Sequence, residues 1–293
     1  MLKAVNKKIF IGTVIIIMLH QSNICGQAII DIKNMDILFS GLDAAFDERT
    51  NTPKDEYYLG RAVAANILAI YKPYIVNSEL INYLNLICQA LVINSAEQAI
   101  YNGYHVMVLD SRELNAFSTP GGHILITKGL INIVPTEDAL AGIIAHEMAH
   151  IMLKHGIKMI NDMKITNEAD IMARQAAAFV GKSNARILSF RDSVNEIFNL
   201  MIKSGYSQPQ EFEADTLAVK LLADAGYSPN GLLEMLNILK TVQSGQSGGI
   251  FSTHPAIVER IVNVQKQITG YKKSDNSFTR RERFSRIIRR GVQ

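Results

Sequence analysis

Apolar residues recur at three- and four-residue spacing through residues 31–95, which is the pattern of amphipathic helices. The spacing is clearest in residues 59–71 (LGRAVAANILAIY) and in residues 80–92 (LINYLNLICQALV). Pro53 and Pro73 predict breaks, and Asn77 followed by Ser-Glu predicts a helix start. We therefore predict that this part of the chain is helical and interrupted at its prolines.

The pattern changes at Gly103. Residues 104–110 (YHVMVLD) alternate and are rich in strand formers, and residues 123–127 (HILIT) form a second such run. The segment between them ends in Pro-Gly-Gly, a turn by composition that suits the edge of a sheet. We expect a small sheet whose exposed edge can accept an extended peptide as an added strand, with Asn115, Gly121 and Gly122 as substrate-binding residues.

The next apolar segment, residues 139–155 (ALAGIIAHEMAHIMLKH), is predicted to be a helix with little exposed surface. Thr136 is a suitable N-cap, and the Glu-Asp pair after it puts negative charge on the first turn. Two histidines and a glutamate stand among the apolar residues. Because buried polar groups need partners, this helix is expected to hold a cation inside the protein.

His146 and His150 are four residues apart, so they lie one above the other on the same helical face. Their ring nitrogens can converge on one ion, while Glu147 can reach a water at the metal without ligating the metal itself. This spacing predicts one Zn²⁺ ion per chain, with Glu147 as the general base. Chance occurrence of the pattern stays open, although the apolar context disfavours it.

Catalytic zinc takes three protein ligands, so a third should come from another helix. Residues 210–220 (QEFEADTLAVK) carry three acidic residues. Glu211 and Asp215 share a helical face, whereas Glu213 is rotated by about 200° from Glu211. We assign Glu211 to the metal and expect Asp215 to accept a hydrogen bond from the far nitrogen of a ligand histidine. Glu213 as the ligand stays an alternative.

Residues 160–205 are predicted to be helical, with a patch of small residues at 173–181. This stretch is either a helical hairpin that covers the cleft or plain scaffold. His105, His123 and His155 are expected to be structural or solvated. His155 lies five residues beyond His150 and should face away from the metal.

The N-terminus has the layout of a secretory signal. Three lysines precede an apolar run at residues 9–19, which is shorter than the span of about 20 residues that a bilayer requires. We assign residues 1–26 to a signal peptide and expect an exported, periplasmic or envelope-associated protein. A lipidated Cys25 and an uncleaved anchor are the alternatives. After cleavage Cys88 is the remaining thiol, so no intramolecular disulfide forms, and Cys88 is expected to be buried.

Charge is distributed unevenly along the chain. The formal net charge is +3, but the signal carries +3 and residues 271–293 carry +6, which leaves −6 for residues 27–270. Nothing in that mildly acidic part suggests a nucleic-acid partner. We treat residues 27–270 as the main domain and 271–293 as a basic tail. The tail is expected to be solvated and disordered, or alternatively to contact an anionic membrane surface as an amphipathic helix.

The combination of His146-Glu-Met-Ala-His150 with Glu211-x-x-x-Asp215 resembles the gluzincin arrangement. Asn115-Ala-Phe, Pro120-Gly-Gly and Ser252-Thr-His-Pro255 with Arg260 are similar to motifs of the metallopeptidase family that includes HtpX heat-shock proteases, CAAX prenyl proteases and BepA chaperone-proteases. The similarity covers residues 57–264.

This resemblance implies an α+β, mostly helical, zincin-like metallopeptidase domain with a small sheet beside the metal-binding helix. It also implies that His254 lies near the metal and Arg260 near the substrate carbonyl, both as catalytic residues. A hypothesis follows: His254 occupies the open zinc position at rest.

The function predicted from these observations is a zinc-dependent endopeptidase that acts on unfolded or misfolded envelope proteins in protein quality control. The alternative is a holdase-like chaperone that binds such proteins and carries a mainly structural zinc.

Overall fold

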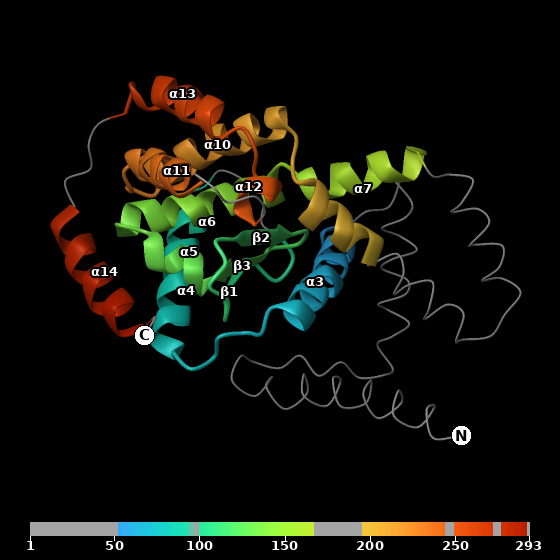
Figure 1. Cartoon of the computed structure of the whole chain (residues 1–293), viewed down its shortest axis with the longest axis horizontal. Coiled ribbons are helices and arrows are strands. Elements are labelled where there is room, and N and C mark those ends of the chain that lie inside the picture. The colour runs from blue at the N-terminus through green and yellow to red at the C-terminus, as the bar shows by residue number, and fades with distance from the viewer. Residues whose placement is uncertain are drawn as a thin grey trace, which may run out of the picture.

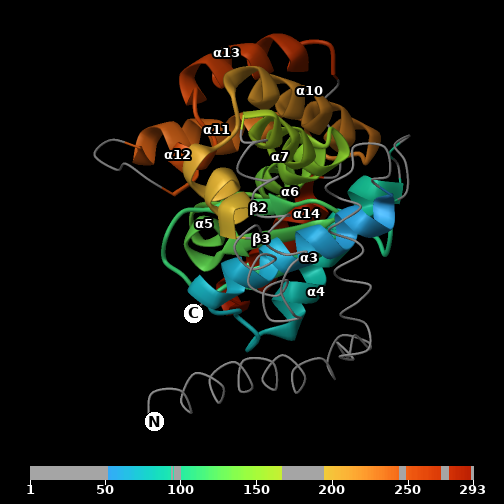
Figure 2. The same ribbon diagram turned by 90° about the vertical axis from the view of Figure 1, so that its right-hand side faces the viewer.

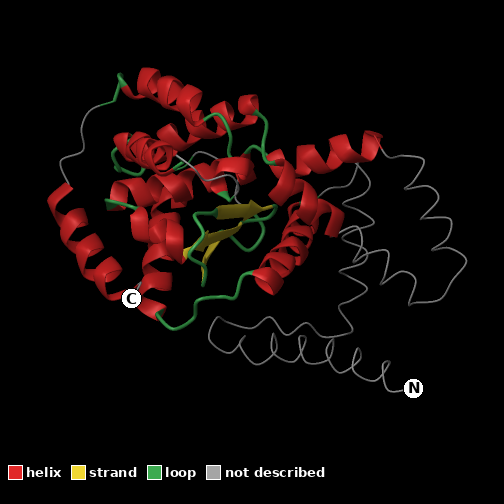
Figure 3. Ribbon diagram, viewed as in Figure 1, coloured by secondary structure: helices red, strands yellow, loops and turns green. Residues whose placement is uncertain are grey.

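A computed structural model describes residues 52–93, 95, 100–166, 195–243, 249–271 and 277–291. The predicted signal peptide and the small-residue patch at 173–181 lie outside the described residues. Within the described ranges, no helix combines the length and the apolar character that crossing a membrane requires. The fold is α+β and mostly helical, with one small sheet, as predicted (Figure 3).

Two helices occupy the predicted N-terminal helical region. Helix α3 (Pro53–Ile70) begins at Thr52, whose side chain and that of Asp55 form a reciprocal capping box. Helix α4 (Ser78–Ile93) begins where predicted, and the Asn77 side chain accepts a hydrogen bond from the backbone N–H of Leu80. The predictions of helices and of breaks at the prolines are confirmed for residues 52–93, whereas residues 31–51 of the predicted helical stretch lie outside the described residues.

The sheet has three strands in the order β1-β3-β2. Strands β1 (His105–Leu109) and β3 (His123–Thr127) are the two predicted runs, and they pair in parallel. Strand β2 (Ala116–Thr119) pairs antiparallel with β3 through the predicted Pro-Gly-Gly turn. The sequence pattern marked this segment only as a sheet edge. In the structure it is a strand whose side chains are all buried.

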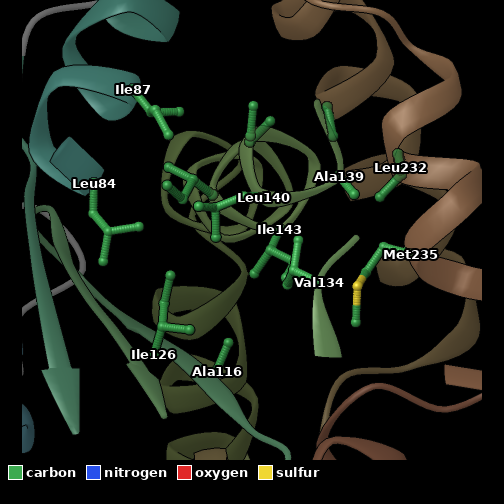
Figure 4. Packing of buried hydrophobic residues seen from close by; sticks show 14 of the residues in the cluster. Leu84, Ile87, Ala116, Ile126, Val134, Ala139, Leu140, Ile143, Leu232 and Met235 are labelled. Carbon is green, nitrogen blue, oxygen red and sulfur yellow. The ribbon is translucent and has the colours of Figure 1, made fainter. Parts of the chain in front are cut away.

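Helix α6 (Glu137–Met152) is the centre of the hydrophobic core. It follows the short helix α5 (Lys128–Ile133), and Thr136 caps it by accepting a hydrogen bond from Ala139 N–H at 3.1 Å. Its side chains pack against α4 and the sheet on one side and against α11 on the other. Figure 4 shows Leu140 and Ile143 between Leu84 of α4 and Met235 of α11. The predicted burial of this helix is confirmed, and so is that of the Cys88 thiol.

Three helices form a layer on the far side of α6 from the sheet (Figures 1 and 2): α10 (Gln208–Asp224), α11 (Asn230–Val242) and α13 (Ile257–Ile268). The four-residue helix α12 (Ile250–Thr253) precedes α13. Gly231 lets α11 approach α6 closely, because a Cβ there would lie 2.2 Å from the carbonyl oxygen of Asp138. Helix α7 (His155–Thr166) follows α6 and contacts the π-helix η2 (Leu200–Ser204).

The C-terminal segment contains helix α14 (Ser277–Gly291), which packs against α4 and α6 on the flank opposite α3 (Figure 1). Phe284 and Ile287 are buried in the main core. The prediction of a solvated, disordered tail is therefore wrong for this helix, because its apolar residues bury against its own domain. Contact with an anionic membrane through its exposed residues Arg281 and Arg286 stays a prediction.

Candidate metal centre

The two histidines of the predicted motif lie on the last two turns of α6. Their Nε2 atoms are 3.0 Å apart, and both side chains are buried. The ring of Tyr206, which follows η2, stacks on the His150 ring with 3.8 Å between centroids and 13° between planes. This contact fixes the plane of His150. No sequence pattern pointed to Tyr206.

Glu211 reaches the same point from helix α10. A capping box between Ser207 and Gln210 fixes the start of that helix at Gln208, so Glu211 lies in its first turn. The Glu211 carboxylate lies 3.4 Å from His146 Nε2 and 3.4 Å from His150 Nε2. Glu211 and Asp215 are both buried, as their shared helical face predicts.

His254 completes the cluster from the loop after α12. Its Nδ1 lies 3.0 Å from Glu211 Oε1 and 3.3 Å from His146 Nε2, and its Nε2 lies 3.4 Å from Glu147 Oε1. One ligand atom from each of His146, His150, Glu211 and His254 lies within 4.8 Å of the others. The structure thus brings together all three predicted ligands, with His254 beside them.

The charges at this point favour a cation. Three buried carboxylates, those of Glu147, Glu211 and Asp215, face a single buried guanidinium, that of Arg260. Glu147 Oε2 is buried without a hydrogen-bond partner among the described residues. A divalent cation would supply the missing positive charge and a partner for the converging imidazole nitrogens, so the residues present fit a metal ion.

The pKa of His146 also indicates that the surroundings favour positive charge at this point. Burial and Arg260 lower the pKa of His146, but the carboxylates of Glu211 and Asp215 raise it to about 9. Burial holds the pKa of His150 well below its usual range, against the opposing effect of Glu211. Of these two histidines, His146 is therefore the one whose surroundings favour the positively charged form.

Asp215 and Arg260 bind the side chains of His146 and Glu211 and hold them in place. Asp215 Oδ1 lies 3.0 Å from His146 Nδ1, the nitrogen that points away from the cluster. Arg260 donates to Asp215 through Nε at 2.8 Å and Nη2 at 2.7 Å, and its Nη1 lies 2.6 Å from Glu211 Oε2. Burial would raise the pKa of both carboxyls, but Arg260 holds the pKa of Glu211 well below its usual range and also lowers that of Asp215.

Arg260 binds the acidic residues of the site. It is 3% exposed, and its guanidinium contacts the carboxylates of Glu211 and Asp215. These contacts position both carboxylates, and the expected role of Arg260 at the substrate carbonyl stays a prediction.

The expectation that His155 faces away from the metal is wrong. Its Nδ1 lies 2.8 Å from His150 Nδ1. Helical spacing does not apply here, because α6 ends at Met152 and Lys154 adopts a left-handed backbone with φ 56° before α7 begins. A lysine gives no sequence signal for such a break. Glu213, the alternative ligand, binds His155 Nε2 at 3.1 Å and lies outside the four-residue cluster.

The predicted substrate-binding residues lie at β2 and its turn. The Asn115 side-chain oxygen accepts from Ala116 N–H at 3.0 Å and from the Thr253 hydroxyl at 3.4 Å. Gly121 and Gly122 have φ of +73° and +104° and are packed against α3 and the loop before β1. These contacts explain the residue types, and binding of substrate by them stays a prediction.

Comparison with known proteins agrees with this site. The model of peptidase family M48 matches residues 81–268. Metalloprotease LoiP of Escherichia coli K12 is 29% identical over 194 residues, which cover 66% of this chain and 73% of LoiP. The E. coli K12 β-barrel assembly-enhancing protease is 22% identical over 199 residues, 67% of this chain and 40% of that protein.

A third relative comes from mitochondria. The metalloendopeptidase OMA1 of Schizosaccharomyces pombe is 26% identical over 154 residues, which cover 52% of this chain and 43% of OMA1. The match to the family model spans the helix with both histidines, the segment with Glu211 and the loop with His254. The chain belongs to peptidase family M48 and is a metalloendopeptidase.

Proposed function

We propose that this protein is a zinc-dependent endopeptidase that hydrolyses peptide bonds in unfolded or misassembled envelope proteins. The observation that carries the proposal is the buried cluster of His146, His150, Glu211 and His254, with the Glu147 carboxylate beside it. Family membership supports hydrolysis. Imidazole nitrogens with one carboxylate form a donor set that zinc prefers.

His146, His150 and Glu211 would hold the zinc ion. When bound, zinc would lower the pKa of a coordinated water to about 7 and polarise the substrate carbonyl. Glu147 would accept the proton of the attacking water and deliver it to the leaving nitrogen. The unpartnered Oε2 of Glu147 leaves this carboxylate free to take that proton.

His254 would regulate access to the metal. Its contacts with Glu211 and His146 put Nδ1 at the fourth corner of the cluster, where a substrate or water would otherwise bind. We propose that His254 closes this corner at rest. After moving aside, it would stabilise the developing charge on the carbonyl oxygen as a hydrogen-bond donor.

The substrate would lie extended along β2. This strand is an outer strand of the described sheet and packs against α6, so a peptide added along it would run close to the metal cluster. A small pocket beside His150 is lined by Ser118, Pro120 and Tyr206 among others. Main-chain binding of this kind suits substrates of unspecified sequence. Asn115, Gly121 and Gly122 would shape that edge.

An envelope location is supported by two observations. The first 26 residues have the layout of a secretory signal, and the relatives include a bacterial protease named for β-barrel assembly. N-terminal sequencing of the protein recovered from the envelope fraction tests export. A new N-terminus near residue 27 is the expected result, and an intact N-terminus would point to the anchored form.

Metal analysis of the purified protein together with digestion of casein tests the activity. We expect one zinc per chain, digestion without chelator, loss of digestion with chelator and recovery on adding zinc. A protein that holds zinc, binds unfolded casein and does not cut it under any of these conditions would favour the holdase-like alternative.

A further inference from the structure

His155 is the first residue of α7, and its side chain is fully buried between a metal-ligand histidine and an acidic residue. Its Nδ1 lies 2.8 Å from His150 Nδ1, and its Nε2 lies 3.1 Å from Glu213 Oε2. The three side chains therefore form a continuous line from the surface of α10 to the cluster. The function proposed above assigns no role to His155 or Glu213.

The chemistry of this line determines where its protons lie. A carboxylate only accepts hydrogen bonds, so Nε2 of His155 must carry the hydrogen that Glu213 receives. In a neutral imidazole the other nitrogen, Nδ1, is then an acceptor. His150 Nδ1 must be the donor in the 2.8 Å contact, and its Nε2 is left with a free lone pair.

That free lone pair points to the cluster. His150 Nε2 lies 3.0 Å from His146 Nε2 and 3.4 Å from Glu211 Oε1. The opposite tautomer of His150 would put a hydrogen at this point and would block coordination. The acceptor on His155 thus selects the one tautomer of His150 that can bind a metal.

We propose that His155, oriented by Glu213, is a positioning residue that holds His150 in its ligand tautomer and ring orientation. The two ligand histidines would then be supported from separate elements. Asp215 and Arg260 support His146 from α10 and α13, and His155 supports His150 from the start of α7. This inference rests on the proposed function, because it needs His150 to be a metal ligand.

The contribution of Glu213 should be smaller than that of His155. The Glu213 side chain is 56% exposed, so water can replace much of its hydrogen bond, whereas His155 is buried. Loss of a buried hydrogen-bond partner of a ligand histidine typically weakens metal affinity by about 10- to 100-fold. We expect a loss of this size when His155 is replaced. In Glu213→Ala the zinc affinity should fall only about two- to fivefold, because water can replace the carboxylate.

The experiment measures zinc affinity by competition with a chromophoric chelator, together with the visible spectrum of the cobalt(II)-loaded protein. His155→Phe keeps a ring but removes the acceptor, and His155→Asn offers an amide oxygen near the former Nδ1. His105→Ala is the matched control, because His105 is an exposed histidine outside the site. We expect weaker zinc binding and an altered cobalt spectrum for Phe, values near wild type for Asn, and no change for the control.

The outcomes separate this inference from the function on which it rests. If the wild type does not bind zinc, the proposed function fails. If the wild type binds zinc and His155→Phe binds it equally tightly with an unchanged cobalt spectrum, the inference is overturned. Equal losses in the Phe and Asn variants would also overturn it, because they would show that packing and not the acceptor sets the affinity.

Discussion

Both ends of helix α6 bury charged side chains, but the partners of these side chains differ between the two ends. At the N-terminal end, Glu137 accepts hydrogen bonds from the Tyr83 hydroxyl at 2.7 Å and from Arg283 Nε at 2.9 Å. Asp138 accepts from Ser228 N–H at 2.8 Å and pairs with Arg280. Both carboxylates therefore have fixed protein partners.

At the C-terminal end the partners are incomplete. Glu147 Oε2 has none among the described residues, and imidazole nitrogens of His146, His150 and His254 converge on one point. Helix α6 is buried along most of its length. The charged side chains at its N-terminal end are all paired with protein groups, whereas those at its C-terminal end lack partners that a bound cation would supply. Burial alone does not mark a functional site, whereas burial with a deficit of partners does.

The largest effect should come from Glu147→Gln at the incomplete end. The amide has nearly the same shape but cannot take a proton, so casein digestion should fall by about 10²- to 10⁴-fold, the range for a lost general base. Zinc affinity should stay near the wild-type value, which equilibrium competition measures. Equal digestion by the metal-loaded wild type and variant would show that Glu147 is not the base.

Arg283→Ala tests the completed end. Removing this arginine leaves the buried Glu137 carboxylate with only neutral hydroxyl donors such as Tyr83, and it should lower the free energy of unfolding by about 2 kcal/mol. The estimate stays below the range for fully buried pairs because Arg283 is 41% exposed. Urea denaturation measures the change.

Arg286→Ala is the control for that experiment, because Arg286 is an exposed arginine on the same helix. It should change stability by less than about 0.5 kcal/mol. If both variants unfold at the same urea concentration, α14 does not stabilise the start of α6. Zinc affinity should be unchanged in both, since the two ends of α6 are satisfied by separate groups.

His254→Ala should have a smaller effect, and one of opposite sign. If His254 closes the fourth corner at rest, its removal should raise casein digestion by about three- to tenfold, which corresponds to a shift of about 0.7 to 1.4 kcal/mol in a two-state equilibrium. Initial rates at equal zinc occupancy measure it. A fall in rate would contradict closure as the dominant role of His254 and would show that its loss as a hydrogen-bond donor to the carbonyl oxygen costs more than the opened corner gains.

Helical spacing predicted four of the residues at the incomplete end, whereas His254 was expected there from the family resemblance alone. The i, i+4 relation aligned His146 with His150 and Glu211 with Asp215, because both pairs lie within unbroken helices. The same rule failed for His155, since the chain turns at Lys154 without a glycine to mark it.

The completed end could not be predicted, because its partners are distant in sequence. Arg283 lies 146 residues beyond Glu137, and Tyr83 lies 54 residues before it. The periodicity of α14 shows that one of its faces is apolar but not which surface covers that face. Composition alone therefore suggested a solvated basic tail, while packing placed the helix on the core.

The smallest effect concerns Cys88, which packs beside the middle of α6 with its sulfur 3.7 Å from that of Met148. Burial raises the pKa of this thiol to about 12, so the folded protein holds its proton from the usual value near 9 up to that pH. Because iodoacetamide reacts with the thiolate, a Cys25→Ser variant should show almost no labelling between pH 7 and pH 9, while the urea-unfolded protein labels faster as pH rises. Above pH 9 the thiol ionises in the unfolded protein but not in the folded one. The free energy of unfolding therefore keeps its full value below pH 9 and falls as pH rises toward 12. Labelling of the native protein that increases with pH in step with the unfolded protein would mean that the centre of α6 opens to solvent. The contrast between its two ends would then not rest on a uniformly buried helix.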